Sequence, residues 1–180
     1  MSVIAFKKNK NEILVAADGI VLSDDKIEDN DFKKIHKISD SLIIGATGLA
    51  DAVGIYKKFV EANRVVFEKL EDSIEAIALF KRLRDYFSNN FGYADETIKE
   101  FGGFLVVNKK FQGVFYFDDH LTPYSTRTEK ENTSFAFGST GIYTTALIDT
   151  GMDIVTAIMK SAEKYNSINS NVTLLKIGLE

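Results

Sequence analysis

The sequence predicts an α+β fold in which two packed sheets are covered on their outer faces by helices. Three observations support this prediction: strand-like apolar runs fall into two groups, helical patterns fall into two pairs, and hydrophobic residues make up 45% of the chain. A chain of 180 residues lies in the size range of one domain and can bury a sizeable core. We therefore expect residues 1–180 to form a single domain.

The first group of strands precedes any helical pattern. Short apolar runs at Val3–Phe6 and Ile13–Ala17 are separated by KKNKNE, a polar stretch with two Asn that is typical of a hairpin turn. A second pair of runs, Lys34–Ile38 and Leu42–Ala46, is separated by SDS, which also has the composition of a turn. These runs predict four strands.

The hydrophobic period then changes to that of helices. Apolar residues recur at helical spacing from Ala50 to Val60 and again from Ala76 to Phe87. Ser73, which precedes the second pattern, is the predicted N-cap. We therefore expect two adjacent helices that cover one of the sheets.

Strand and helix patterns alternate through the second half of the chain. Aromatic and β-branched runs predict strands at Phe104–Asn108, Gly113–Asp118, Ser134–Phe137 and Val172–Ile177. Between the last two strands, Ile142–Asp149 and a segment capped by Asp153 have helical patterns. The polar stretch YSTRTEKENTS, which precedes the third of these strands, is typical of a loop.

The residue types that are missing narrow the possible chemistry. The chain contains no Cys, which excludes disulfides, thiolate metal sites and a cysteine nucleophile. Its two His residues, His36 in a predicted strand and His120 in a predicted loop, lie far apart and have no zinc-motif spacing. Ser, Thr, Lys, Asp and Glu remain as candidate nucleophiles.

Charge and hydropathy point away from nucleic acid and membranes. The net charge of −4 provides no broad basic field for a polyphosphate partner. No apolar run is long enough to cross a bilayer, and the N-terminus lacks the pattern of a secretory signal. We therefore expect a soluble cytoplasmic protein that binds neither nucleic acid nor membrane.

One acidic segment leaves the question of a metal open. Asp24, Asp25, Glu28 and Asp29 lie close together in sequence. Such a run can hold a cation, although a solvated loop is its more common meaning. The sequence therefore does not assign a metal site.

The second residue, Ser2, is the first candidate for chemistry. It follows Met1 directly and precedes a predicted strand. Removal of Met1 would give Ser2 both a hydroxyl and a free α-amine, a pair that can act as a nucleophile and its own base. The ordinary pKa of an α-amine is about 7.7–8.0, so a nearby ammonium that lowers it would leave the amine neutral near pH 7.

Four further residues have types and positions that suit this chemistry. Lys34 can supply the positive charge, and Asp18, at the end of the second strand, can hold that lysine. Gly48 lies where a strand meets a helix, so its N–H can face a developing oxyanion. The hydroxyl of Ser139, at a second such junction, can relay a proton.

Together these residues resemble the proteasome β-subunit family, and most closely its HslV-type branch of N-terminal-nucleophile hydrolases. With Ser2 at the nucleophile position, Asp18 and Lys34 fall on the family aspartate and lysine without a gap. IIGATGLADA is similar to a family segment that consists of a strand, a glycine-containing turn and the start of a helix. In this alignment Gly48 falls on the glycine that stabilises the oxyanion in the family. FAFGSTGIYTTAL, with Ser139, and INSNVTLLKI resemble the family's late turn, helix and final strand.

The resemblance implies a fold, a mechanism and partners. The fold is a four-layer αββα sandwich of two antiparallel sheets, and the mechanism is that of a threonine-type peptidase, here with serine and without a cofactor. Partners would be identical subunits in a ring, with a peptide or unfolded protein as substrate and an AAA+ unfoldase as a further candidate. The late polar residue of the family site has three candidates here: Ser167, Asn169 and Ser170.

Two alternatives remain open at this stage. IAFK also resembles the family's LAFK, and that register would place Met1 at the nucleophile position. A chain that retains Met1 would then be a catalytically inactive assembly or binding protein. An amidase that acts on small molecules would share the Ser2 nucleophile and differ in its pocket.

Overall fold

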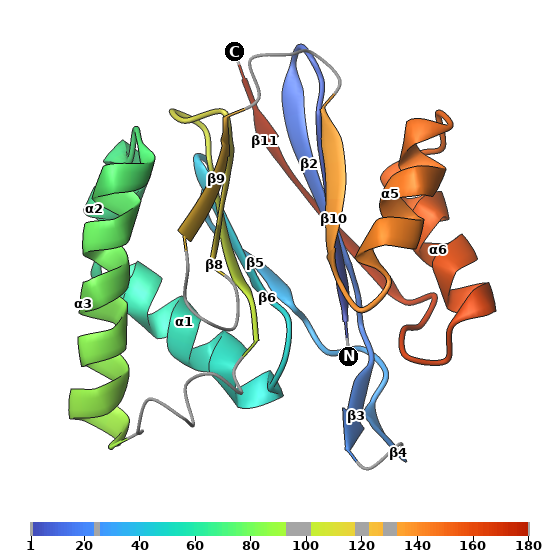
Figure 1. Ribbon diagram of the computed structural model, residues 1–180, viewed down its shortest axis with the longest axis horizontal. Coiled ribbons are helices and arrows are strands. Elements are labelled where there is room, and N and C mark those ends of the chain that lie inside the picture. The colour runs from blue at the N-terminus through green and yellow to red at the C-terminus, as the bar shows by residue number, and fades with distance from the viewer. Residues whose placement is uncertain (1, 24–25, 93–101, 118–122, 128–132, 180) are drawn as a thin grey trace.

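The computed structural model describes residues 2–23, 26–92, 102–117, 123–127 and 133–179. Figure 1 shows four layers in succession: three helices, a sheet, a second sheet and two helices. The α+β prediction of two antiparallel sheets between helical layers is therefore confirmed.

The first sheet carries the N-terminal strand at its centre. Its four antiparallel strands follow the order β10-β1-β2-β11. Their bounds are Val3–Lys8 for β1, Glu12–Asp18 for β2, Ser134–Gly138 for β10 and Val172–Gly178 for β11. Because β1 pairs with both β10 and β2, the residue in front of it lies between the ends of two neighbouring strands.

The second sheet has five antiparallel strands in the order β5-β6-β7-β8-β9. Their bounds are Ile35–Ser39 for β5, Leu42–Ala46 for β6, Phe104–Asn108 for β7, Gly113–Phe117 for β8 and Pro123–Arg127 for β9. A separate two-stranded hairpin, β3 (Val21–Ser23) and β4 (Lys26–Asp29), extends from the end of the first sheet.

The two sheets pack face to face through apolar side chains. Strands such as β1 are apolar on both faces, so one face packs on the other sheet and the other face packs on helices. Ile4 and Phe6 of β1 point into the core between the sheets, whereas Val3 and Ala5 point to the helices on the other side. Burial on both faces explains why β1 is a continuous apolar run rather than an alternating one. The same division holds in β6, where Ile43 faces the first sheet.

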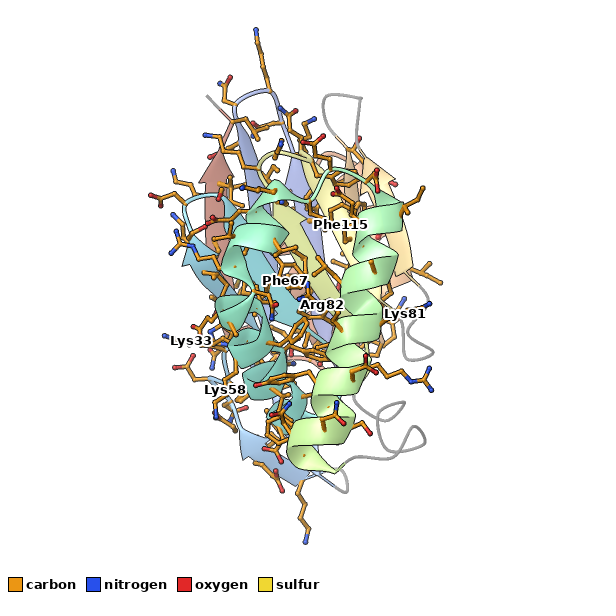
Figure 2. The ribbon with its side chains drawn as sticks, turned by 90° about the vertical axis from the view of Figure 1, so that its left-hand side faces the viewer. Lys33, Lys58, Phe67, Lys81, Arg82 and Phe115 are labelled. Atoms are coloured by element: carbon orange, nitrogen blue, oxygen red, sulfur yellow. The ribbon has the colours of Figure 1, made fainter. Side chains whose placement is uncertain are left out.

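Two helical layers close the outer faces. Helices α1 (Ala50–Ala62), α2 (Arg64–Lys69) and α3 (Ser73–Phe91) cover the second sheet, and α5 (Gly141–Asp149) and α6 (Ile154–Lys164) cover the first. Figure 2 shows the α1–α3 face, where Lys58, Lys81 and Arg82 are exposed while Phe67 and Phe115 are buried. Among the described residues, no helix has the length and apolar character that a bilayer span requires.

The structure corrects several boundaries of the predicted elements. Six strands precede the first helix instead of four, because the β3–β4 hairpin follows β2. Three helices, including the short α2, replace the predicted pair. Part of the predicted loop YSTRTEKENTS belongs to β9, the edge strand of the second sheet. The residues of this stretch that lie in β9 are mostly polar, which explains why their composition resembled a loop.

The N-cap of α3 is Asp72, not Ser73. The Asp72 carboxylate accepts hydrogen bonds from the amides of Ile74 and Glu75, both at 2.9 Å. A carboxylate at this position satisfies two amides that have no partner within the helix. His120, Asp24 and Asp25 lie outside the described residues, and within the described ranges no three His, Cys, Asp or Glu side chains are grouped to hold a metal ion.

Candidate active site

Ser2 is held by the segment that follows β10. Only 3% of Ser2 is exposed, and its carbonyl accepts hydrogen bonds from the Ser139 amide at 2.9 Å and the Ser139 hydroxyl at 3.4 Å. Gly138 has φ +98°, and a β-carbon there would overlap the Ser2 carbonyl oxygen. Glycine at this position therefore permits the close approach that places Ser139 against Ser2.

Asp18 and Lys34 form a buried ion pair that also contacts the amide of Val3, the residue after Ser2. The Lys34 ammonium donates to Asp18 Oδ2 at 2.8 Å, and the two side chains are 4% and 0% exposed. Asp18 Oδ1 accepts the amide of Val3 at 2.8 Å, and Oδ2 also accepts the amide of Ile20 at 3.2 Å. The carboxylate thus orients both the lysine and the backbone next to Ser2.

Burial makes the Lys34 ammonium easier to deprotonate. Loss of solvent around the ammonium lowers the pKa of Lys34 from its usual 10.5, and attraction to Asp18 opposes this shift without cancelling it. A cation in such a surrounding exerts its field on neighbouring groups with little screening by water. An amine placed next to it would itself have a lowered pKa.

The Gly48 turn is fixed by the segment that leads into β7. Gly48 has φ +110°, which favours glycine. The Thr47 amide donates to the Gly103 carbonyl at 2.8 Å, and the Gly103 amide donates to the Thr47 hydroxyl at 3.2 Å. A β-carbon at Gly102 would overlap the Thr47 carbonyl. These contacts set the direction of the backbone at the start of α1.

Of the three candidates for the late polar residue, Ser170 is exposed, and Ser167 and Asn169 make different contacts. The Ser167 hydroxyl lies 3.5 Å from the Ser139 hydroxyl, so these two residues are in hydrogen-bonding range. Asn169 instead accepts the Gly19 amide at 2.9 Å and donates to the Asn30 carbonyl at 2.8 Å, which fixes the loop after β2. Ser167 is therefore the candidate that joins the Ser2–Ser139 contacts.

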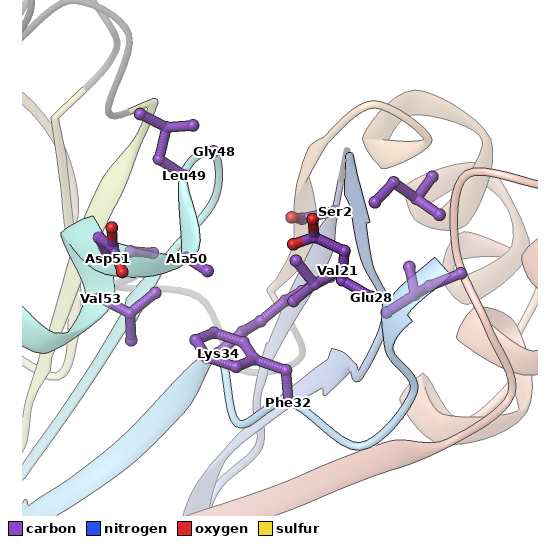
Figure 3. Close-up of a pocket in the computed structure, with 13 residues that line it drawn as sticks. Ser2, Val21, Glu28, Phe32, Lys34, Gly48, Leu49, Ala50, Asp51 and Val53 are labelled. Atoms are coloured by element: carbon purple, nitrogen blue, oxygen red, sulfur yellow. The ribbon is translucent and has the colours of Figure 1, made fainter. Parts of the chain in front are cut away.

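A cavity of about 260 Å³ connects these groups. It is lined by Ser2, Ile20, Val21, Leu22, Glu28, Phe32, Lys34, Ala46, Gly48, Leu49, Ala50, Asp51 and Val53. Figure 3 shows Ser2 and Lys34 on one wall and Gly48 at the turn on the opposite wall. Three of the five predicted site residues line this cavity: Ser2, Lys34 and Gly48. Of the other two, Asp18 contacts the Lys34 side chain and Ser139 contacts the backbone of Ser2.

A comparison with protein families decides the affiliation. The proteasome subunit model matches residues 2–98, which is just over half of the chain and includes the whole segment from Ser2 to Gly48.

The chain belongs to the proteasome subunit family.

This membership confirms the resemblance that the sequence motifs predicted. No curated protein matches this proteasome family chain.

Solved structures with the same fold include one of an HslV protein and two of a protein called BPH. HslV from Trypanosoma brucei is 15% identical, with a TM-score of 0.73 over 98% of this chain and 99% of that one. BPH from Thiobacillus denitrificans in complex with epoxomicin is 17% identical, with a TM-score of 0.77 over 99% of each chain. A second BPH structure is 16% identical, with a TM-score of 0.73 over 99% and 98%. At these identities the comparison establishes the shared four-layer fold.

Sequence reasoning did not find the residues that shape the cavity around the five site residues of this proteasome family member. The β3–β4 hairpin contributes Val21, Leu22 and Glu28, and the first turn of α1 contributes Asp51. Glu28 was interpreted as part of an acidic loop, yet it lies in β4 and lines the cavity. The one signal in the sequence was this acidic run, and the position of Glu28 in the cavity that Ser2 lines depends on the turn of the chain after β2.

Proposed function

We propose that this proteasome family protein is a cytoplasmic peptidase whose nucleophile is the Ser2 hydroxyl after removal of Met1. The observation that carries the proposal is the set of contacts around Ser2. Asp18 binds both Lys34 and the amide next to Ser2, and Ser2, Lys34 and Gly48 line one cavity. Acyl transfer requires a nucleophile, a charged group that adjusts the pKa of the base, and a backbone donor for the oxyanion. Ser2, Lys34 and Gly48 would supply these three components beside one cavity.

The α-amine of Ser2 would act as the general base. Its ordinary pKa of about 7.7–8.0 already lies near neutrality. The field of the buried Lys34 ammonium favours the neutral amine, because a second positive charge nearby is unfavourable. The amine then accepts the hydroxyl proton, directly or through a water, as the Ser2 oxygen attacks. While Met1 is attached, the Ser2 nitrogen is an amide and has no basic lone pair.

The reaction would proceed through an acyl-enzyme. The Ser2 oxygen forms a bond to the substrate carbonyl carbon, and the Gly48 amide stabilises the negative charge on the carbonyl oxygen. The peptide C–N bond breaks and its nitrogen takes the proton held by the amine. A water molecule then hydrolyses the ester and restores Ser2. Ser139, in contact with Ser2 and Ser167, would relay protons during these steps.

Assembly is part of the proposal. Members of the proteasome family form rings, and we propose a ring of identical copies of this chain that admits peptides and unfolded proteins. Large apolar side chains that are exposed in the isolated chain, including Ile142 at 93% and Ile74 at 75%, support association with further copies. An AAA+ unfoldase would supply folded substrates to such a ring.

The deciding experiment compares Met-free protein with its Ser2→Ala and Ser2→Thr variants on fluorogenic peptide amides. We expect the wild type to cleave the peptides, Ser2→Ala to lose at least about a thousandfold in kcat, and Ser2→Thr to retain activity because it keeps the hydroxyl. Co-production with methionine aminopeptidase and intact mass measurement establish that the chain begins at Ser2.

A covalent probe gives an independent readout. A peptide epoxyketone has two adjacent electrophilic carbons, which match a residue that offers a hydroxyl and a free α-amine. We expect one adduct on Ser2 in Met-free protein and none on protein that retains Met1. Unchanged turnover by Ser2→Ala would refute Ser2 as the nucleophile. No turnover and no adduct with a free Ser2 would instead support the inactive assembly protein. Turnover of small amides alone would support the amidase.

A further inference from the structure

We infer that the cavity beside Ser2 selects substrates with a cationic side chain, and that Glu28 and Asp51 determine this specificity. The inference rests on the proposed peptidase function, and it names the substrate class of that site. A lysine or arginine side chain next to the scissile bond is the occupant that the lining of the cavity matches.

The charges of the cavity do not balance. Glu28, Asp51 and Lys34 are its charged lining residues, and the charge of Lys34 is neutralised by its buried ion pair with Asp18. Neither Glu28 nor Asp51 has an ion-pair partner within the described part of the chain. The cavity therefore has two negative charges without a partner, and a cation in the substrate would supply one.

The positions of the two carboxylates also suit a cationic side chain. Figure 3 shows Glu28 on the wall that contains Ser2, and Asp51 on the opposite wall at the start of α1. A cation between these walls would be attracted by both carboxylates. Because both residues are solvent-exposed, they attract a cation without the large desolvation cost of a buried site.

The remaining lining is apolar and includes small residues. Val21, Phe32 and Val53 offer hydrophobic surface, and Ala46 and Ala50 leave space between the walls. Lysine and arginine have an aliphatic stem and a charged end, so they can place the stem on such a surface and the charge near carboxylates. An acidic substrate side chain would meet two like charges in the same cavity.

The two carboxylates differ in whether they also have a structural role. Asp51 lies in the first turn of α1, where a negative charge stabilises the helix dipole even without a substrate. Glu28 lies in the exposed strand β4 and has no such role. Glu28 is therefore the stronger determinant, and the two residues are tested separately.

The experiment uses Met-free protein and a set of fluorogenic peptide amides that differ only in the residue before the scissile bond: Lys, Arg, Gln, Leu or Glu. We expect higher kcat/KM for Lys and Arg than for Gln or Leu, with a preference that falls as ionic strength rises. Each of Glu28→Gln and Asp51→Asn should lower the Lys-to-Leu ratio, by up to about fivefold, the upper range for an exposed ion pair.

Two controls separate specificity from structure. Glu61→Gln removes a carboxylate from α1 that is 50% exposed and does not line the cavity, so it should leave the Lys-to-Leu ratio unchanged. The Lys-to-Leu ratio is taken within each variant, so a general loss of activity in Glu28→Gln or Asp51→Asn cancels in it and only a charge-dependent change remains.

Binding gives a readout that does not depend on catalysis. Fluorescence polarisation of labelled Lys and Leu peptides on the Ser2→Ala variant should show the same charge preference and the same response to Glu28→Gln. Equal affinity for Lys and Leu peptides, or a preference that both substitutions leave intact, would overturn the inferred specificity even if the Leu peptide is cleaved. Selective binding without turnover of any peptide by the wild type would refute the peptidase and retain the cationic site.

Discussion

Replacing Asp18 with Asn tests whether the buried ion pair stabilises the site around Ser2. The Asp18 carboxylate accepts the amides of Val3 and Ile20 at 2.8 and 3.2 Å and the ammonium of Lys34 at 2.8 Å. An Asn side chain has a single acceptor oxygen, so its NH₂ group would face at least one of these donors. Lys34 would also lose its counter-charge while it stays buried.

The size of the effect follows from the geometry of the pair. Two unit charges 2.8 Å apart attract each other by about 6 kcal/mol at an effective dielectric constant of about 20. Release of the Lys34 proton offsets part of this loss, because burial already lowers the pKa of that ammonium. Removal of one partner from a buried pair typically costs about 3–5 kcal/mol. We therefore expect Asp18→Asn to lower the free energy of unfolding by about 4 kcal/mol.

Equilibrium unfolding in urea at a fixed protein concentration measures this loss. The matched control is Asp40→Asn, because Asp40 pairs with Lys37 at the same 2.8 Å while their side chains are 101% and 40% exposed. That substitution should change the free energy of unfolding far less than Asp18→Asn does, because water screens an exposed ion pair. Adding Lys34→Met to Asp18→Asn should recover about 2 kcal/mol by removing the unpaired charge. Equal losses for Asp18→Asn and Asp40→Asn would refute the argument from burial.

Two further predictions concern buried polar groups. The hydroxyl of Tyr56 has no hydrogen-bond partner among the described residues, and its ring stacks on Phe104 with centroids 4.4 Å apart. Tyr56→Phe keeps the ring and removes the unsatisfied hydroxyl, so it should raise the free energy of unfolding by about 1 kcal/mol; a lower melting temperature in calorimetry would contradict this. The second prediction concerns pH: burial lowers the folded-state pKa of Lys34 below 10.5, so the unfolded chain binds this proton more tightly. Stability should therefore rise with pH between the lowered pKa and 10.5, and urea titrations should show a smaller rise in Lys34→Met. An equal slope in both proteins would contradict the assigned shift.

The elements that could be predicted from the sequence are those whose burial leaves a pattern. Strands β1 and β2 are buried on both faces, so they form continuous apolar runs with a polar turn between them. Helix α6 buries Ile154, Ala157 and Ile158 on one face, which gives the helical period after Asp153. In each case the core imposes hydrophobicity at a spacing that identifies the element.

The missed elements are those that contribute little to the core. All residues of β4 are exposed, so no alternation of apolar and polar residues marks the strand. Helix α2 has six residues and buries only Phe67, which is too short a segment to define a period. The error at the start of α3 has a different origin: Asp72 and Ser73 are both good N-caps, and only the observed bonds to Ile74 and Glu75 choose between them.

The residues of the candidate site could be named from their order in the sequence, but most of their contacts could not. The spacing of Ser2, Asp18 and Lys34 matched the family, and the structure brings Asp18 and Lys34 into contact. Their catalytic roles stay predictions. The contact between Ser139 and Ser167 depends on how α5, α6 and β11 return the chain to the first sheet, which no local pattern contains.

The position of the site at the junction of two sheets explains why these long-range contacts matter for chemistry. Ser2 directly precedes β1 of the first sheet. Asp18 of β2 accepts the amide of Val3, and Ser139, which follows β10, donates to the Ser2 carbonyl. Gly48 follows β6 of the second sheet, so a nucleophile and its oxyanion donor would come from different layers. A small slide of one sheet past the other would change the distance between them. Lys34, which precedes β5 and pairs with Asp18 of β2, links the two sheets at this end. We therefore predict a positioning role for the ion pair, because it joins β2 of the first sheet to the residue in front of β5, which pairs with the strand that precedes Gly48.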